Sequence, residues 1–344
     1  MLGGFGRLFR RDVVRNEEAA SVPLTGDSSE ATGANPMLVE PKLSCVQYDN
    51  FAREWMTVSQ MDTFDGFRVE VGKPLSKSFN AAHTLLLGTQ QKGQPYAYQF
   101  GPVFQSEDGR LFVMGKTSLD GLLNARVVKK IWGPYCDIRA NLTSCIIEPS
   151  RNMYEFSKDL NFKRWSTSTK LVWQGIWIMN FGFSSMISKS LHLGGEVTYL
   201  NLVHRGASMG TLGIRYDSGG NVCSATIGRT PDFKNPMRDD ILHGVRMQYV
   251  RKISDRLSMG CEFDYSYPDY ESAMKVGYEY TFRTSRVQGL LDTAGRVSCF
   301  INDFKGFALS GMIDYFHNDY KFGMLMHYFP AGENAEGGEG GVVM

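Results

Sequence analysis

Residues Leu257 to Tyr267 read LSMGCEFDYSY, and their side chains alternate between two kinds. Every second residue, from Leu257 through Phe263 to Tyr267, is apolar or aromatic, whereas the residues between them include Glu262 and Asp264. A period of two is typical of a β-strand with one apolar and one polar face. The length of this strand suits a tilted crossing of a lipid bilayer.

The same alternation recurs from about residue 66 to residue 329, interrupted by turn signals such as Asp120-Gly121 and Thr293-Ala294-Gly295. Division at these turns gives roughly fourteen residues per strand and turn, which matches a bilayer-crossing strand with a short connection. The pattern predicts nineteen strands, at 66–73, 79–89, 94–106, 109–118, 120–131, 134–147, 151–163, 165–175, 176–188, 191–204, 206–218, 220–229, 240–252, 256–267, 270–283, 285–293, 295–303, 306–317 and 319–329.

The composition favours an all-β protein and excludes several classes. The chain has 344 residues, of which 37 are Gly, and 12% are aromatic. Its 37 Lys and Arg residues balance 36 Asp and Glu residues, which argues against a nucleic-acid binder held by phosphate neutralisation. The aromatic content is too high for a disordered chain.

No pattern of catalytic or metal-ligating residues stands out. The six cysteines and six histidines are scattered without ligand spacing, and neither a nucleophile elbow nor a phosphate loop is present. Glu262 and Asp264 lie two residues apart on one strand face, a spacing more typical of solvated charges than of an acid and base pair. We therefore expect no enzyme activity, catalytic residue, metal or cofactor.

Four segments are expected along the chain. Residues 1–43 have few large apolar residues and are predicted to be a disordered N-terminal segment, without a secretory signal. Residues 44–65 are expected to form a short amphipathic helix and a linker, with Phe51, Arg53 and Trp55 as its candidate lumen residues. Residues 66–329 form the strand region, and residues 330–344 are a Gly- and Glu-rich tail.

Alternation alone does not say which face is inside. A soluble barrel or sandwich buries its apolar face, whereas a membrane barrel turns that face to lipid and lines a wet lumen with the polar one. Long uninterrupted strands favour the membrane barrel, as do aromatic residues near strand ends. Those aromatics are Phe67, Trp132, Trp165, Tyr199, Tyr249, Tyr267, Phe282 and Tyr328.

In a membrane barrel the polar faces would line a pore of mixed charge. The candidate pore-lining residues are Arg68, Glu70, Arg126, Arg139, Glu196, Arg246, Glu262, Asp264, Glu279 and Asp314, and the same faces carry Glu155, Asp159, Lys170, Lys275 and Arg296. Acidic patches among them would attract basic groups weakly at several sites. Alternatively, opposite charges on adjacent strands only pair with each other along the wall.

An ordered set of motifs in the strand region resembles a known family. These are Phe64-Asp65-Gly66-Phe67-Arg68, Gly72 to Phe79, Asp120 to Arg126, Leu193 to Val197, Tyr249 to Ser254, Gly277-Tyr278, Arg286 to Gly289 and Asp319 to Gly323. Together they resemble the channel-forming subunit of the mitochondrial outer-membrane protein translocase, the TOM complex, within the eukaryotic porin superfamily. The resemblance implies a nineteen-stranded barrel with parallel first and last strands and a helix near the lumen wall.

The same resemblance implies a sorting signal in the last strand. It would be carried by Lys321, Gly323, Met324, Met326 and Tyr328, although an ordinary final strand would look similar. Two features depart from the family's pattern: the length of the tail beyond Phe329, and the segment from Arg229 to Asp239, which looks inserted.

The function expected from this resemblance is import. The protein would be a multi-pass β-barrel of the mitochondrial outer membrane that conducts unfolded precursor proteins with presequences. Its partners would be those precursors, receptor and small helical subunits of an oligomeric complex, and membrane lipids, but not nucleic acid. The alternatives are a metabolite pore of the voltage-dependent anion channel type and, more remotely, a soluble β-rich binding protein.

Overall fold

The computed structural model describes residues 45–91, 94–133, 135–201, 206–231 and 241–328. The expected N-terminal segment 1–43 and the tail 330–344 lie outside the described residues, as does most of the segment that looks inserted, at 232–240.

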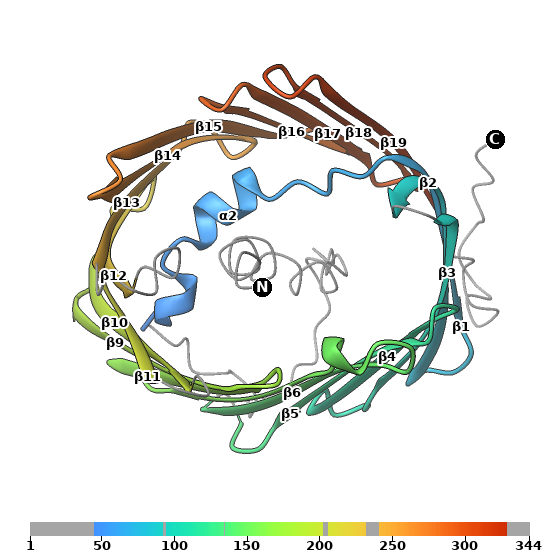
Figure 1. The fold of residues 1–344 in the computed structure, drawn as a ribbon, viewed down its shortest axis with the longest axis horizontal. Helices are drawn as coiled ribbons and strands as arrows, with labels where there is room; N and C mark the ends of the chain where they lie inside the picture. The colour runs from blue at the N-terminus through green and yellow to red at the C-terminus, as the bar shows by residue number, and fades with distance from the viewer. Residues whose placement is uncertain (1–44, 92–93, 134, 202–205, 232–240, 329–344) are drawn as a thin grey trace, which may run out of the picture.

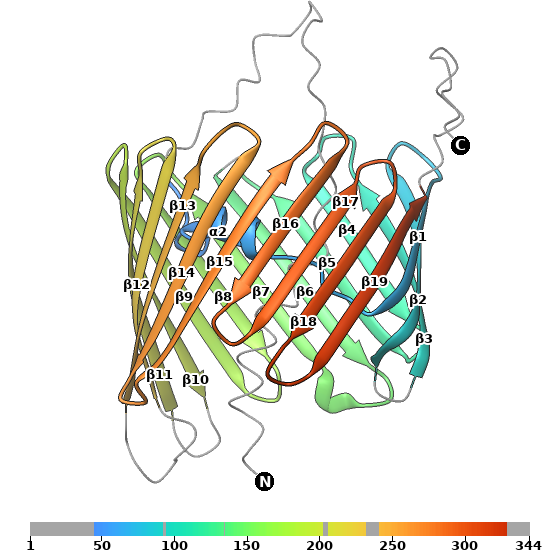
Figure 2. The same ribbon diagram turned by 90° about the horizontal axis from the view of Figure 1, so that it is seen from above.

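Nineteen strands form one closed sheet, which confirms the expected all-β barrel. Each strand pairs antiparallel with its neighbour in sequence, and β1 pairs in parallel with β19 to close the ring (Figures 1 and 2). The strands are β1(Gly66–Pro74), β2(Phe79–Gln91), β3(Gln94–Gln105), β4(Leu111–Ser118), β5(Leu122–Lys130), β6(Cys136–Cys145), β7(Met153–Asn161), β8(Trp165–Trp173), β9(Trp177–Ser188), β10(Leu191–Asn201), β11(Gly206–Asp217), β12(Asn221–Pro231), β13(Ile241–Lys252), β14(Leu257–Tyr267), β15(Glu271–Thr281), β16(Ser285–Asp292), β17(Arg296–Asp303), β18(Phe307–Asp314) and β19(Asp319–Tyr328). Their described ends lie within about three residues of the expected ones, the usual uncertainty of strand boundaries.

The two faces of the sheet differ as the alternation requires. On one face of β13–β15, Gln248 faces Glu262, which faces Lys275. On the other face, Met247 and Phe263 are 52% and 42% exposed. Since the first face touches the chain segment inside the barrel, the polar face is internal and the apolar face is the outer surface.

The segment before β1 lies inside the ring (Figure 1). It contains a single 3₁₀ turn, η1(Tyr48–Asn50), and a short helix, α2(Arg53–Ser59), which contacts β13 to β16. Helix α2 is the short helix expected within residues 44–65. The helical run is divided because Ala52, with φ −96° and ψ 10°, leaves the helical region between the two turns.

Apolar side chains of this inner segment, residues 45–65, are pressed against the wall. Phe51, Trp55, Val58 and Phe64 are each at most 3% exposed. Phe64 packs with Phe300, Ala308 and Leu325 of the inner face, and Trp55 and Val58 pack with Val250. The described core of the protein therefore sits between the inner segment and one side of the barrel.

Glycines of the wall provide the room for these side chains. A Cβ atom on Gly260 would lie 2.9 Å from the Trp55 ring, and one on Gly277 would lie 3.1 Å from Val58. Gly323 of β19 is likewise filled by the ring of Phe64. Real Cβ atoms rarely approach so closely, so a larger residue would push the inner segment off the wall.

We expect Gly260→Ala to destabilise the folded protein by about 1–3 kcal/mol, the usual cost of overpacking, and to loosen Trp55. Denaturant unfolding in detergent, followed by tryptophan fluorescence, measures this change. Gly244→Ala on β13 is the matched control, because no atom lies within 4 Å of a Cβ added there. Equal stability of the two variants would show that Gly260 does not position the inner segment.

Candidate functional site

All ten candidate residues from the sequence lie on the inner face of the wall, and most of them pair across adjacent strands. Arg246 contacts Asp264 at 2.6 Å, and Glu262 contacts Lys275 at 3.1 Å. Arg286 with Glu279 at 2.6 Å, Arg296 with Asp314 at 2.8 Å, and Arg139 with Asp159 also pair across adjacent strands, whereas Arg68 pairs with Glu70 on the same strand, β1. The expected alternative, in which charges pair along the wall, therefore applies to these residues.

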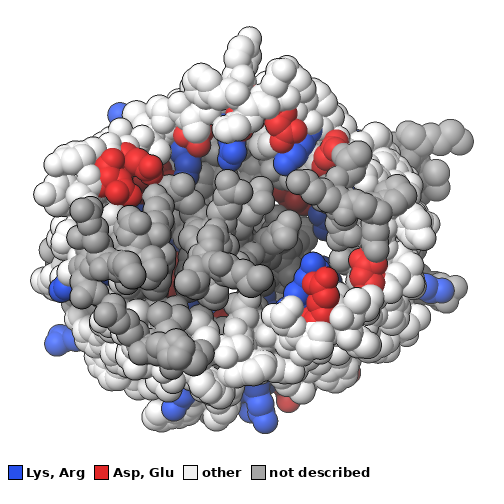
Figure 3. Space-filling view, viewed as in Figure 1, with Lys and Arg blue, Asp and Glu red and all other residues white. Residues whose placement is uncertain are grey.

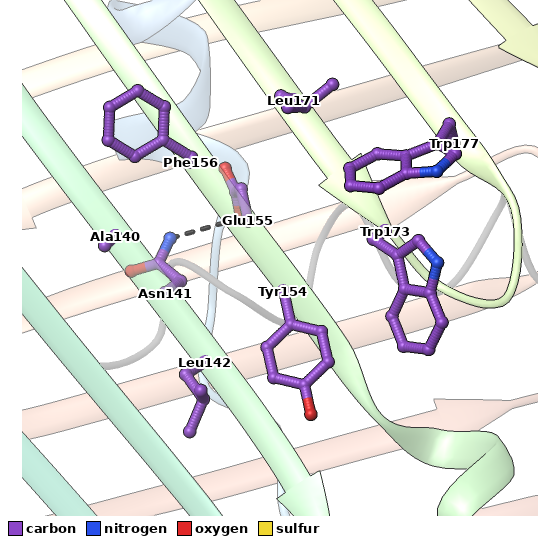
Figure 4. Close-up of a pocket in the computed structure, with 9 residues that line it drawn as sticks. All are labelled: Ala140, Asn141, Leu142, Tyr154, Glu155, Phe156, Leu171, Trp173 and Trp177. Atoms are coloured by element: carbon purple, nitrogen blue, oxygen red, sulfur yellow. Dashed lines mark hydrogen bonds between the residues drawn. The ribbon is translucent and has the colours of Figure 1, made fainter.

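Two carboxylates of the wall are held by amides instead of cations. Glu155 on β7 accepts a hydrogen bond from Asn141 Nδ2 at 3.1 Å (Figure 4), and Glu196 on β10 accepts one from Asn180. An amide satisfies the oxygen without neutralising its charge. Neither Glu155 nor Glu196 therefore has a cationic partner among the described ion pairs.

The inner segment supplies three further carboxylates, each of which binds a basic residue of the wall. Asp49 contacts Lys170 at 2.6 Å, and Asp62 contacts Arg68 at 2.9 Å. Glu54 binds Arg215 through two contacts, at 2.5 and 2.8 Å. The Arg215 side chain is only 2% exposed, and its Nη1 also donates to the carbonyl of Phe51 at 2.8 Å.

The charges on the strands themselves are balanced. Among the described strands, the inner face carries equal numbers of acidic and basic residues. The acidic residues are Glu70, Asp137, Glu155, Asp159, Glu196, Asp217, Glu262, Asp264, Glu271, Glu279, Asp292, Asp314 and Asp319. The basic residues are Arg68, Lys116, Arg126, Lys130, Arg139, Lys170, Arg215, Arg246, Lys252, Lys275, Arg286, Arg296 and Lys321.

The inner segment adds four acidic residues and a single basic one, Arg53, to this balanced wall. One of its carboxylates, Asp49, binds Lys170, which would otherwise offset the nearby wall acids Glu155 and Glu196. The described lumen is therefore net negative, although charges of both signs lie side by side around its opening (Figure 3).

Burial and hydrogen-bond partners shift the pKa values of two side chains of the inner segment, Glu54 and Tyr48. Burial alone would raise the pKa of Glu54, but the hydrogen bonds and charge of Arg215 outweigh it and hold that pKa below its usual value. Burial raises the pKa of Tyr48, whose hydroxyl donates to Thr211 Oγ1 at 2.9 Å. At neutral pH Glu54 is charged and Tyr48 is neutral.

The three lumen-helix candidates differ in their positions. Phe51 and Trp55 are buried against the wall, whereas the Arg53 side chain is 66% exposed and contacts only its neighbour Glu54, at 3.3 Å, among the described ion pairs. The sequence analysis missed the acidic anchors Asp49 and Glu54. Their partner strands are more than a hundred residues away, and no local signal reveals such a pairing.

The residues of the expected sorting signal occupy both faces of β19. Met324, Met326 and Tyr328 are 42%, 36% and 56% exposed on the outer surface, whereas Gly323 lies under Phe64 inside. Lys321 contacts Asp319 at 3.7 Å. Gly323 thus makes room for the Phe64 ring, and this packing role is separate from the expected role in sorting.

A groove crosses the outer surface of β6 to β9 (Figure 4). The side chains that line its outer side include Leu142, Tyr154, Phe156, Trp173 and Trp177, and the rings of Tyr154 and Trp173 lie 5.4 Å apart. Most of the residues that line this groove are apolar or aromatic, and Asn141 and Glu155 are the polar side chains at its inner side. Within the described part of the chain, no group of three potential metal ligands is present, and no helix is long and apolar enough to cross a membrane.

A closed barrel with an apolar outer surface and a charged lumen defines a channel-forming membrane β-barrel. The chain belongs to the eukaryotic porin family, whose model matches residues 45–323.

Three curated proteins are similar to this chain over most of its length. The chain is 27% identical over 304 residues to the probable mitochondrial import receptor subunit TOM40-2 of Arabidopsis thaliana, covering 83% of this chain and 90% of the relative. It is 24% identical to the subunit TOM40 of Saccharomyces cerevisiae, covering 87% and 79%. It is 22% identical to the TOM40 homolog 2 of Drosophila melanogaster, covering 77% and 78%.

We expect Glu54→Gln to loosen the inner segment, because it removes the closer of the two carboxylates that hold the buried Arg215 and leaves only Asp217 of the wall, at 3.2 Å. Breaking a buried pair in this way costs about 3–5 kcal/mol. Hydrogen exchange of residues 48–60 should accelerate strongly. Glu148→Gln, which removes a partner of the exposed Arg151 pair, is the control and should leave that exchange unchanged.

The same pair predicts a pH dependence. Since the pKa of Glu54 is lower in the folded protein than in the unfolded chain, its stabilising effect is complete above about pH 4.5 and is lost as the pH falls through the folded value. Protection of residues 48–60 should therefore fall on acidification below about pH 4.5. Glu54→Gln should remove most of that dependence, and an unchanged pH profile would contradict the assignment.

Proposed function

We propose that this barrel is the protein-conducting channel through which unfolded precursor proteins cross the mitochondrial outer membrane. The observation that carries the proposal is a charged lumen, net negative over the described residues, in a eukaryotic porin whose curated relatives are named as mitochondrial import receptor subunits. Each of those relatives aligns with this chain over most of the length of the two proteins compared. The alternative of a metabolite pore is less well supported, because none of these relatives is named as one.

The charge of the lumen suits a basic, extended substrate. Most wall carboxylates are paired to cations, so a passing polypeptide meets few strong sites, and Glu155 and Glu196 offer weak attraction at separate positions. A channel needs this combination, because substrate must enter and also leave. Binding of presequences by these residues follows from the proposed function.

Several further parts of the proposal follow from the family that the sequence motifs resemble. The channel would work in an oligomeric translocase with receptor and small helical subunits. The exposed residues Met324, Met326 and Tyr328, with Lys321 and Gly323, would form the sorting signal read during membrane insertion. Strand addition to an unpaired edge is the physical route for such capture. Transport, and not catalysis, is the activity we assign.

We expect the refolded protein to form a cation-preferring pore in a planar bilayer that a basic presequence peptide blocks in a voltage-dependent way. Glu155→Gln with Glu196→Gln should weaken the block about fivefold for each charge removed and reduce cation preference. Glu107→Gln with Asp108→Asn, in the turn between β3 and β4, removes equal charge far from these positions and is the control. An anion-preferring pore that ignores the peptide would contradict the proposal.

A further inference from the structure

The charged residues of the strands are sorted strictly between the two faces. In the described strands every acidic residue except Asp303 faces inward. The outward-facing charged residues are Lys73, Lys129, Lys158, Arg229, Arg251 and Asp303. The outer surface, which is otherwise apolar, therefore carries charge that is almost entirely basic.

These outward basic residues gather at one end of the barrel. Strands β1 and β19 run in parallel, so both begin at one end, the Gly66 end, and finish at the other, the Tyr328 end. Lys73, Lys129, Lys158 and Arg251 lie near the ends of β1, β5, β7 and β13, which all finish at the Tyr328 end. At the Gly66 end, Arg229 is the single outward charge among the described strand residues.

The four residues at the Tyr328 end, here named the basic collar, are exposed and have no ion-pair partner among the described residues. Lys129 and Lys158 both align with Ile138, which lies between them on β6. Two strand spacings separate these lysines, about 10 Å at the backbone. Long side chains at this separation reach toward the same patch of membrane surface.

The turns show the same difference in charge between the two ends of the barrel. In the described turns at the Tyr328 end, eight basic residues, Lys189 and Lys305 among them, exceed three acidic ones. In the described turns at the Gly66 end, Arg151 stands against Asp120, Glu148 and Asp269. Among the described turns, those at the Tyr328 end therefore surround the collar with a field that favours anions.

We propose that the basic collar binds the headgroups of anionic phospholipids at the Tyr328 end of the barrel. A strand residue that points outward near the edge of the apolar band meets lipid, because bilayer surrounds the outer wall. The partner that complements four unpaired cations there is a phosphate-bearing headgroup with net negative charge. This inference needs only a membrane barrel and does not depend on what the channel transports.

The test is the association of spin-labelled lipids with the barrel reconstituted in phosphatidylcholine vesicles. Immobilised spectra give the preference for phosphatidylserine over phosphatidylcholine. We expect a preference of about fivefold per collar site at low salt, and weaker at 0.5 M salt. The variant Lys73→Gln, Lys129→Gln, Lys158→Gln and Arg251→Gln should bring the preference close to one.

The matched control removes equal charge from turns at the same end, through Lys77→Gln, Arg110→Gln, Lys189→Gln and Lys305→Gln. It should retain most of the preference. Loss of preference in this control with retention in the collar variant would overturn the proposal and point to contacts with the turns, as would no preference in the original protein. If the collar variant fails to refold, Lys129→Gln with Lys158→Gln should still lose part of the preference, and an unchanged preference would also overturn it.

Discussion

Closure of the sheet is the constraint on which the rest of this structure depends. In lipid, an open strand edge would leave backbone N–H and C=O groups without partners, at a cost of several kcal/mol for each group. Nineteen is an odd number, so an antiparallel meander returns with its last strand parallel to its first. The pairing of β1 with β19 is the result, and it places both strands' beginnings at one end.

The seam formed by these two strands also fixes the inner segment. Glu70 of β1 contacts His327 of β19 and also Arg68 on its own strand, and Arg68 contacts Asp62 of the linker. Phe64 fills the space over Gly323 on the same strand pair. The point of closure is therefore the point at which the chain enters the lumen, and the buried pair of Glu54 and Arg215 holds the segment further along the wall. These contacts give a lumen whose wall is balanced in charge and whose inner segment makes it negative.

The barrel could be predicted from the sequence because the signals that locate each strand lie within the strand and its flanking turns. A period of two and the turn residues between strands locate each element, and they work for Leu257 to Tyr267 without knowledge of any neighbour. The inner-face residues follow from the same alternation. The contacts between them do not, because Asp49 reaches Lys170 and Glu54 reaches Arg215 only after the ring has closed.

The most direct test of a protein-conducting lumen is to ask which face of the wall a precursor touches during passage. A photoreactive phenylalanine analogue would be placed at Asn180, on the inner face of β9, or at the adjacent Met179, which is 54% exposed on the outer surface. A precursor with a basic presequence would be arrested by a folded domain and the sample irradiated. The account predicts crosslinks to the precursor from position 180 and none from position 179. Crosslinks from position 179 alone, or from neither position while the precursor is arrested, would contradict it.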